Sequence, residues 1–304
     1  MTNKNFTLPN LKVLPYGGAK NIPDTNCSQA LSIAIADAYA SLESKDINQQ
    51  YLDSYQSWIC QTELNSLVGL DNFKHAVYSQ GTTETFDKFY MKHHTRRFRC
   101  FRGEYMYHQL AWRNHWPNWE FIQNLDIRAG DAVVISMPFA DTGDVHPEYH
   151  ALMEKCQQLN VPVLIDSAYF GICGGLTLDY SYDCITDIAF SLSKTFPVSH
   201  IRIGMRLSRV DDDDPLLVYH KTNYTNRIGA SVGLELMRQF SSDYTVNTYR
   251  TTQQELCRQL DVDPSPCVIF GVDYRSVWPQ YNRGAGSSRL CIADNLVSNT
   301  VDLS

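Results

Sequence analysis

Short apolar runs alternate with helix-like segments along the middle of the chain, and this alternation constrains the fold more than any other sequence feature. The runs at 132–137, 161–165, 187–192 and 201–207 are bounded by polar or turn-forming residues and have the length of buried strands. Segment 147–159, which starts with a proline, has helical character. Strands that alternate with helices form parallel sheets covered on both faces. The sequence therefore predicts an α/β fold with a three-layer α/β/α large domain.

The two ends of the chain differ from this middle part. Residues 1–25 are rich in Pro, Gly and Asn, and they predict an extended N-terminal arm. We expect the large domain at 26–240. We expect residues 241–304, with part of the arm, to form a reduced small C-terminal domain that starts with a helix at 244–260. Other elements expected in the large domain are helices at 28–42, 81–91 and 228–240 and a strand at 74–79.

Charge and composition exclude several classes of protein. The formal net charge is −7, whereas a nucleic-acid partner requires a basic surface. Apolar stretches fall short of the roughly 20 residues that span a bilayer, and the polar N-terminus has no signal segment. The nine cysteines are scattered without CxxC spacing, which favours reduced thiols over a metal site or disulfides. We expect a cytoplasmic protein that binds neither a membrane nor nucleic acid nor a metal.

Chemically active residue types come after the predicted strands, at the edge of the sheet where ligands bind in α/β folds. Gly81, Thr82 and Thr83 precede a helix, and such a turn either cradles a phosphate or simply caps the helix. Asp166 ends a strand, and its carboxylate either caps a helix or holds the proton of a cationic ring such as a pyridinium.

Lys194 is the most informative of these residues. It lies just beyond an apolar strand, where burial would lower the pKa of its amine and free it to form a Schiff base. Ser191 and Arg202 flank it and could bind a phosphate. The alternative from the residues alone is an ordinary charge at the end of a strand.

The segment Ser-Leu-Ser-Lys-Thr-Phe around Lys194, followed at the appropriate spacing by Arg202, resembles the lysine motif of class I/II aminotransferases. These enzymes depend on pyridoxal 5′-phosphate and have fold type I. The resemblance implies that Lys194 forms the Schiff base with this cofactor. It also implies that Asp166 meets the pyridine nitrogen and that Tyr169 meets the ring hydroxyl.

Further segments match the same family in the same order along the chain. The resemblance implies that Gly81, Thr82 and Thr83 join Ser191 and Arg202 around the phosphate. Tyr105, in the segment Gly-Glu-Tyr-Met-Tyr, would stack on the ring, and Arg289 would bind the α-carboxylate of an amino-acid substrate. Tyr51 is a weaker match to a tyrosine that reaches the phosphate site of a neighbouring subunit, which implies a homodimer.

Three functions remain open on these residues. In the first, an aminotransferase, Lys194 moves the substrate Cα proton and Asp166 keeps the pyridine protonated. The second is another reaction of the same cofactor at an amino acid: decarboxylation, β/γ-elimination or replacement, or O2-dependent oxidation. The third, a non-catalytic relic, is disfavoured because a relic has no need of Lys194, Asp166 and Arg202.

The chain departs from the family pattern at two places, and a basic stretch also stands out. Ala140 replaces an asparagine that hydrogen-bonds the ring hydroxyl, so Tyr169 would act alone unless Asp141 or Thr142 helps. The segment from Lys194 to the C-terminus is short, which predicts the reduced small domain. A basic stretch at 93–102 is either a solvated loop or a source of an arginine for an acidic substrate group.

Loss of the asparagine at position 140 leads to a first prediction. With one donor fewer on the ring hydroxyl, we expect the pKa of the Lys194 Schiff base to lie above the family's usual value. A spectrophotometric pH titration of the bound cofactor measures it, and an ordinary family value would contradict the prediction.

Overall fold

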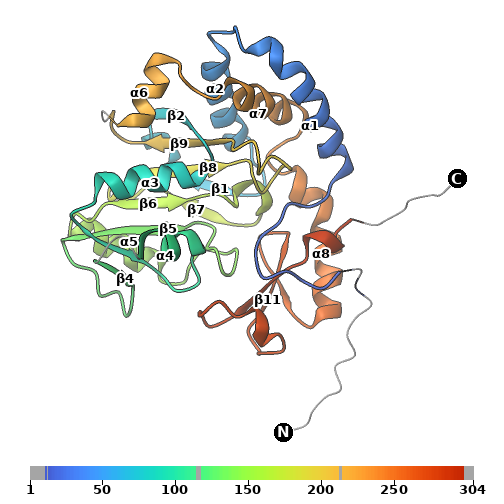
Figure 1. The fold of residues 1–304 in the computed structure, drawn as a ribbon. Helices are drawn as coiled ribbons and strands as arrows, with labels where there is room; N and C mark the ends of the chain where they lie inside the picture. The colour runs from blue at the N-terminus through green and yellow to red at the C-terminus, as the bar shows by residue number, and fades with distance from the viewer. Residues whose placement is uncertain (1–10, 12, 114–117, 212–213, 298–304) are drawn as a thin grey trace, which may run out of the picture.

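A seven-stranded sheet lies at the centre of the computed structural model, which describes residues 11, 13–113, 118–211 and 214–297 (Figure 1). The strand order is β2–β9–β8–β6–β5–β3–β4. All neighbouring strands are parallel except where β9 pairs with β2 and β8. The strands are β2 (His75–Ser79), β3 (Arg97–Cys100), β4 (Trp119–Phe121), β5 (Asp131–Ser136), β6 (Val163–Asp166), β8 (Ile185–Ser191) and β9 (Gly204–Ser208). The predicted α/β fold is confirmed.

Helices cover both faces of this sheet, because apolar side chains of its inner strands point alternately to the two sides. Ala132 and Val134 of β5 belong to an apolar cluster with α3 (Thr82–Lys92). Val133 and Ile135 belong to the larger core on the opposite face, with side chains of α2 (Ile47–Cys60) and α5 (Tyr149–Gln158). The result is the expected three-layer arrangement. The other helices of this part are α1 (Thr25–Ala38), α4 (Met106–Arg113), α6 (Pro215–Thr222) and α7 (Arg227–Gln239).

A second, three-stranded antiparallel sheet lies beside the large one, towards the C-terminus. It consists of β10 (Asp263–Pro264), β11 (Phe270–Asp273) and β12 (Ser288–Cys291), and α8 (Tyr244–Leu260) packs on it. The N-terminal segment runs along this sheet, where Tyr16 and Cys291 exchange two backbone hydrogen bonds of 2.9 Å. A short pair, β1 (Ser66–Val68) and β7 (Thr177–Asp179), completes the strands.

The differences between predicted and observed elements have local causes. Helix α8 has the predicted bounds, whereas α1 begins earlier than expected because the Asp24 side chain accepts a hydrogen bond from the Cys27 amide (2.9 Å) and caps it. The strand expected at 201–207 starts only at Gly204, since Arg202 has a positive φ of 64°.

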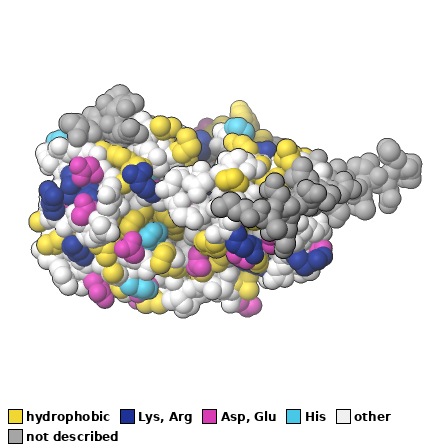
Figure 2. Space-filling view, turned by 90° about the horizontal axis from the view of Figure 1, so that it is seen from below, with side chains coloured by type: hydrophobic (Ala, Val, Ile, Leu, Met, Phe, Trp, Pro, Cys, Tyr) yellow, Lys and Arg dark blue, Asp and Glu magenta, His cyan; other side chains and the backbone are white. Residues whose placement is uncertain are grey.

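The surface carries charges of both signs. On the face shown in Figure 2, Lys and Arg side chains lie interspersed with Asp and Glu side chains and with apolar ones. Such a mixture gives this face no strong field of a single sign. No helix of the described residues is long and apolar enough to cross a membrane.

The central arginines of the basic stretch at 93–102 pair with acidic side chains at the edge of the sheet. Arg99 is 1% exposed and donates to the Asp131 carboxylate (3.1 Å), to that of Asp126, and to backbone carbonyl groups. Arg97 makes two further bonds to Asp131 (2.7 and 3.0 Å). The stretch is therefore not a solvated loop: Arg97 and Arg99 belong to β3, and Arg99 is buried.

This buried ion-pair network predicts a large stability effect. We expect Arg99→Ala to lower the free energy of unfolding by about 3 kcal/mol, since the carbonyl groups and carboxylates around Arg99 lose their donor. Arg128→Ala, at an exposed position close in sequence, should change it by less than about 0.5 kcal/mol. Urea unfolding measures both, and equal effects of the two substitutions would show that the network does not stabilise the sheet edge.

Candidate active site

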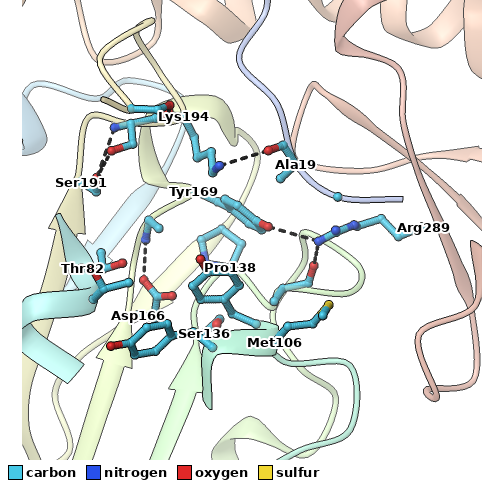
Figure 3. A pocket seen from close by; sticks show the side chains of 18 of the residues that line it. Ala19, Thr82, Met106, Ser136, Pro138, Asp166, Tyr169, Ser191, Lys194 and Arg289 are labelled. Carbon is cyan, nitrogen blue, oxygen red and sulfur yellow. Dashed lines mark hydrogen bonds between the residues drawn. The ribbon is translucent and has the colours of Figure 1, made fainter. Parts of the chain in front are cut away.

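A cavity of about 800 Å³ lies at the carboxyl edge of the large sheet, where it faces the small sheet and the N-terminal segment (Figure 3). Strands β2, β5, β6 and β8 end at this edge and the antiparallel β9 begins there. The structure thus brings together residues that are far apart in sequence. Nine predicted site residues line the cavity: Thr82, Thr83, Tyr105, Asp166, Tyr169, Ser191, Lys194, Arg202 and Arg289.

One end of the cavity is rich in hydrogen-bond donors. Here α3 begins, and no side chain among the described residues caps its first turn. Arg202 donates from Nη2 to Thr83 Oγ1 (2.9 Å) and to the Gln80 carbonyl oxygen (3.1 Å). Gly81 lies behind this guanidinium group: a Cβ at Gly81 would come within 2.4 Å of Nη2, and φ of Gly81 is +73°. Free helix N–H groups, a hydroxyl and a guanidinium group make this end suitable for an anion such as a phosphate.

The backbone of Arg202 is held in an unusual conformation. Its φ of +64° lies in the left-handed region, which non-glycine residues rarely adopt. The Tyr78 hydroxyl donates to its carbonyl oxygen (2.9 Å), and its own amide donates to the Val198 carbonyl (3.3 Å). Such strain is maintained where surrounding contacts fix it, and it often occurs at functional sites. Here it directs the guanidinium group towards the first turn of α3.

Lys194 lies three residues beyond the end of β8, on the wall of the cavity. Its Nζ donates to the Ala19 carbonyl oxygen (3.1 Å) in the N-terminal segment, and it forms no ion pair with any carboxylate of the described residues (Figure 3). Burial lowers the pKa of this amine, and the positive charges of Arg289 and Arg202 lower it further. A larger neutral fraction makes the amine a better nucleophile.

Asp166 lies at the floor of the cavity, at the last position of β6. It accepts a hydrogen bond from the Ala168 amide (3.0 Å), and burial raises the pKa of its carboxyl group to about 8. The buried Glu104 nearby raises it as well. Because Ser136 is the register partner of Asp166, and its amide and hydroxyl donate to Glu104 (2.8 and 2.5 Å), the two carboxyl groups are close neighbours. A cationic partner beside this carboxyl group would favour its ionised form.

Arg289 and Tyr169 meet at the other end of the cavity. Arg289 is 2% exposed, and its Nη1 donates to the Tyr169 hydroxyl (3.1 Å) and to the Ala140 carbonyl oxygen (Figure 3). Its Nη2 donates to the Gly17 carbonyl (3.1 Å), its guanidinium group lies over the Phe270 ring, and its Nε has no acceptor among the described residues. No described carboxylate lies within ion-pair distance of it. A buried cation of this kind favours an anionic ligand.

The segment that departs from the family pattern offers no side-chain replacement for the missing asparagine. Asp141 is fully buried and accepts from the Ser287 hydroxyl (2.8 Å), and Thr142 accepts from the Asp144 amide (3.3 Å). Neither residue lines the cavity, although Ala140 does. Beside Ala140, the side chain that presents a hydroxyl group to the cavity is therefore that of Tyr169.

Two predicted site residues have other roles in the structure, and for Tyr51 the prediction is wrong. Tyr51 is fully buried in the core, and its hydroxyl donates to the Gly204 carbonyl oxygen (2.9 Å) of the same chain. Because its hydroxyl is occupied there, Tyr51 cannot reach the site of a neighbouring subunit in this conformation. Ser191 lines the cavity, but its hydroxyl is engaged with Ser193 Oγ (2.8 Å) and the Ile203 carbonyl (3.2 Å).

The sequence did not identify Glu104, Arg283 or the N-terminal segment as parts of this region. Arg283 lines the cavity, and its Nη2 donates to the Glu104 carbonyl oxygen (2.9 Å). Glu104 directly precedes Tyr105, and a charged residue next to a predicted site residue was the signal that could have identified it. Arg283 lies in an irregular loop between β11 and β12, where no periodic pattern exists. The N-terminal segment also lines the cavity, with Tyr16, Gly17, Gly18 and Ala19. The sequence of an extended arm does not indicate which part of the protein the arm contacts.

No protein-family model matches the chain, and no curated protein matches it in sequence. Solved structures do match it over most of its length. It is 15% identical to the histidinol-phosphate aminotransferase from Clostridium acetobutylicum, with a TM-score of 0.60, and the match covers 93% of this chain and 95% of that one. It is 14% identical to a double mutant of Thermus thermophilus aspartate aminotransferase, with a TM-score of 0.66, over 94% and 88% of the two chains.

A lyase has a similar structure. The PLP-bound C–S lyase from Staphylococcus hominis, in complex with L-cycloserine, is 11% identical, with a TM-score of 0.63, and the match covers 97% of this chain and 88% of that chain. At these identities the likeness establishes the fold: the chain has the class I/II aminotransferase fold, fold type I. It does not by itself distinguish a transferase from a lyase.

The raised pKa of Asp166 predicts how stability depends on pH in the cofactor-free protein. The carboxyl group of Asp166 has a pKa of about 8 in the folded state and the ordinary value of 3.8 in the unfolded state, so the folded state binds the proton more tightly. The free energy of unfolding therefore falls as the pH rises from about 4 to about 8. Asp166→Asn keeps the hydrogen bond to Ala168 and removes this dependence. We expect it to stabilise the protein by a few kcal/mol at pH 8 and to have little effect near pH 4.

Urea unfolding between pH 4 and 8.5 measures this, with Glu148→Gln, at an exposed position, as the control. Parallel stability curves for the wild type and Asp166→Asn would mean that Asp166 has an ordinary pKa.

Proposed function

We propose that this protein is a pyridoxal 5′-phosphate-dependent aminotransferase that acts on an amino acid, with Lys194 as the residue that binds the cofactor covalently. One observation supports this most strongly. A buried amine without an ionic partner among the described residues, Lys194, shares a cavity with a donor-rich anion site at Arg202 and with the buried carboxyl group of Asp166. A flat cationic ring that carries a phosphate and an aldehyde satisfies all three groups at once.

The residues around the cavity fit the parts of this cofactor. Thr82, Thr83 and Arg202, with the N-terminus of α3, would hold the phosphate. Asp166 would hold the proton on the pyridine nitrogen, which gives the negative charge of its carboxylate a positive partner. Tyr169 would contact the ring hydroxyl. Tyr105, which lines the cavity together with Asp166 and Arg202, would lie against the ring.

The chain's own residues supply the proton transfers and the orientation of the substrate. When bound, the cofactor supplies an electron-withdrawing ring that stabilises negative charge at the substrate Cα. Lys194 would hold the cofactor, and its free Nζ would accept the proton from the substrate Cα as general base and return it as general acid. Its lowered pKa favours the first of these steps. Arg289 binds the carboxylate and so orients the Cα–H bond towards Lys194.

A second candidate is another reaction of the same cofactor at an amino acid, such as β/γ-elimination. Ala140 favours it, because the side chain that supports the ring hydroxyl in the aminotransferase pattern is missing and neither Asp141 nor Thr142 lines the cavity. The C–S lyase from Staphylococcus hominis has the same fold as this chain.

The proposal includes a homodimer in a reducing, cytoplasmic compartment. All nine cysteines are free in the structure, which is typical of such a compartment. Met106 and Leu110 at the rim of the cavity are 54% and 58% exposed, and a second subunit would cover such apolar side chains.

The proposal predicts a cofactor absorption band that depends on Lys194. We expect purified protein supplied with pyridoxal 5′-phosphate to show the absorption band of the Schiff base. Lys194→Ala and Lys194→Arg should lose this band. Lys74→Ala, at an exposed position, is the control and should keep it. A band that persists in both Lys194 variants would contradict the role of Lys194.

Incubation with a panel of L-amino acids then separates the two reactions. Release of a 2-oxo acid in the amount of the cofactor, without ammonia, supports transamination. Ammonia, CO2 or peroxide formed over many turnovers supports the second candidate, and a protein that never binds pyridoxal 5′-phosphate would refute both.

A further inference from the structure

Two guanidinium groups meet at a single oxygen atom in the wall of the cavity. Nη1 of Arg289 and Nη1 of Arg283 (3.2 Å) both donate to the Ala140 carbonyl oxygen. Since both donors lie within hydrogen-bond distance of one atom, the two positive charges are close neighbours. Both residues line the cavity, and the side chain of Arg283 is 15% exposed. Like charges held together away from water repel each other unless an anion lies between them.

Ion pairs with described carboxylates balance these two arginines only in part. Arg289 has no carboxylate partner among the described residues, and Arg283 has one, Asp141, at 3.7 Å between Nη1 and Oδ1. That carboxylate is itself held by the Ser287 hydroxyl (2.8 Å) and lies outside the cavity lining. The two hydrogen bonds of Arg283 to carbonyl groups use one N–H on each Nη, so the group retains donors for a ligand. The buried Glu104 carboxyl group also interacts with Arg283, but burial raises its pKa to about 7, so it is only partly ionised near neutral pH. An anionic ligand between the two arginines would complete the balance of charge.

We propose that Arg283 is a second carboxylate-binding residue, and that Arg283 and Arg289 together bind the carboxylate of the substrate from two sides. This inference rests on the proposed function and specifies its substrate site further. Ala140 is part of the arrangement, because its carbonyl oxygen accepts hydrogen bonds from both guanidinium groups. Arg283 thus provides donors in the region where the asparagine of the family pattern is absent.

The arrangement disfavours one of the alternative reactions. In decarboxylation the bond between Cα and the carboxylate carbon breaks, its electron pair stays on Cα, and the carboxylate leaves as neutral CO2. Two cations that bind the carboxylate stabilise the starting charge more than the transition state in which this charge leaves the group. Reactions that keep the carboxylate, such as transamination and elimination, retain the full interaction throughout.

The rim of the cavity suggests which carboxylate to use as a probe. Tyr16, Tyr105, Met106 and Leu110 line the cavity and are each at least 43% exposed, so the cavity presents apolar surface near its opening. The compound 3-phenylpropanoate has one carboxylate and an apolar group, and it has no amine with which to react. Its affinity for the cofactor-loaded protein is measured by calorimetry, which needs no catalytic turnover.

We expect Arg283→Gln and Arg289→Gln each to weaken 3-phenylpropanoate binding by about 10- to 100-fold. Arg283→Lys, which keeps the charge but not the planar fork, should fall between Arg283→Gln and the wild type. Arg275→Gln is the matched control, since Arg275 belongs to the same part of the chain, is 48% exposed and pairs with Asp261. It should bind as the wild type does.

The inference is overturned if Arg283→Gln binds the probe like the control while Arg289→Gln alone loses affinity. It is also overturned if the wild type does not bind the probe. Cofactor binding, measured by absorption for every variant, decides the proposed function separately from the role of Arg283.

A crystal structure of the wild type with 3-phenylpropanoate keeps the inference testable even if Arg283→Gln does not fold. Carboxylate oxygens within hydrogen-bond distance of both guanidinium groups are the expected result. A carboxylate held by Arg289 alone, or bound elsewhere, would refute the role of Arg283.

Discussion

Buried ionisable groups without an ionic partner are the physical constraint on which the cavity of this protein depends. Lys194, Asp166 and Arg289 all line one cavity, and none forms an ion pair with a described residue. Water solvates them poorly at this depth, so each is costly unless a ligand compensates it. A fold retains such groups where their charge is used. At the edge of the sheet, by contrast, the buried Arg99 and Asp131 pair with each other.

The fold makes this concentration of charge possible. Parallel strands end at one edge of the sheet, so Asp166 at the end of β6 and the turn after β8 that carries Lys194 lie next to each other. The antiparallel β9 begins at the same edge and returns Arg202 to the start of α3. The small sheet and the N-terminal segment then close the other side with Arg289 and the Ala19 carbonyl. The site thus combines residues of the N-terminal segment, of the large sheet and of the small sheet.

Much of the fold and of the site could be predicted from the sequence, because both depend on apolar strands and on the residues directly after them. The apolar runs at β5 and β6 indicated the sheet, and Asp166 and Lys194 were found because they lie at the ends of such runs. The Asp24 cap and the left-handed conformation of Arg202 were not predictable, since side-chain hydrogen bonds and tertiary contacts determine them. Arg283 was missed because an irregular loop carries no periodic signal. The domain limits at 26–240 and 241–304 stay predictions.

Tyr51 shows the limit of a motif match made on residue type alone. A tyrosine in a plausible place in the sequence can equally well be a core residue, and here it packs beside Tyr55 and Tyr78 with its hydroxyl bonded to Gly204. The residues that were assigned correctly to the cavity share a structural reason for their position at the carboxyl edge of the sheet. Tyr51, in the middle of α2, has none.

The most direct test of the central claim is chemical fixation of the cofactor to its lysine. Purified protein is incubated with pyridoxal 5′-phosphate and reduced with sodium borohydride, and the peptides are mapped by mass spectrometry. The account predicts that the phosphopyridoxyl group is found on Lys194. Labelling that is absent from Lys194, or spread over exposed lysines such as Lys74, would contradict it.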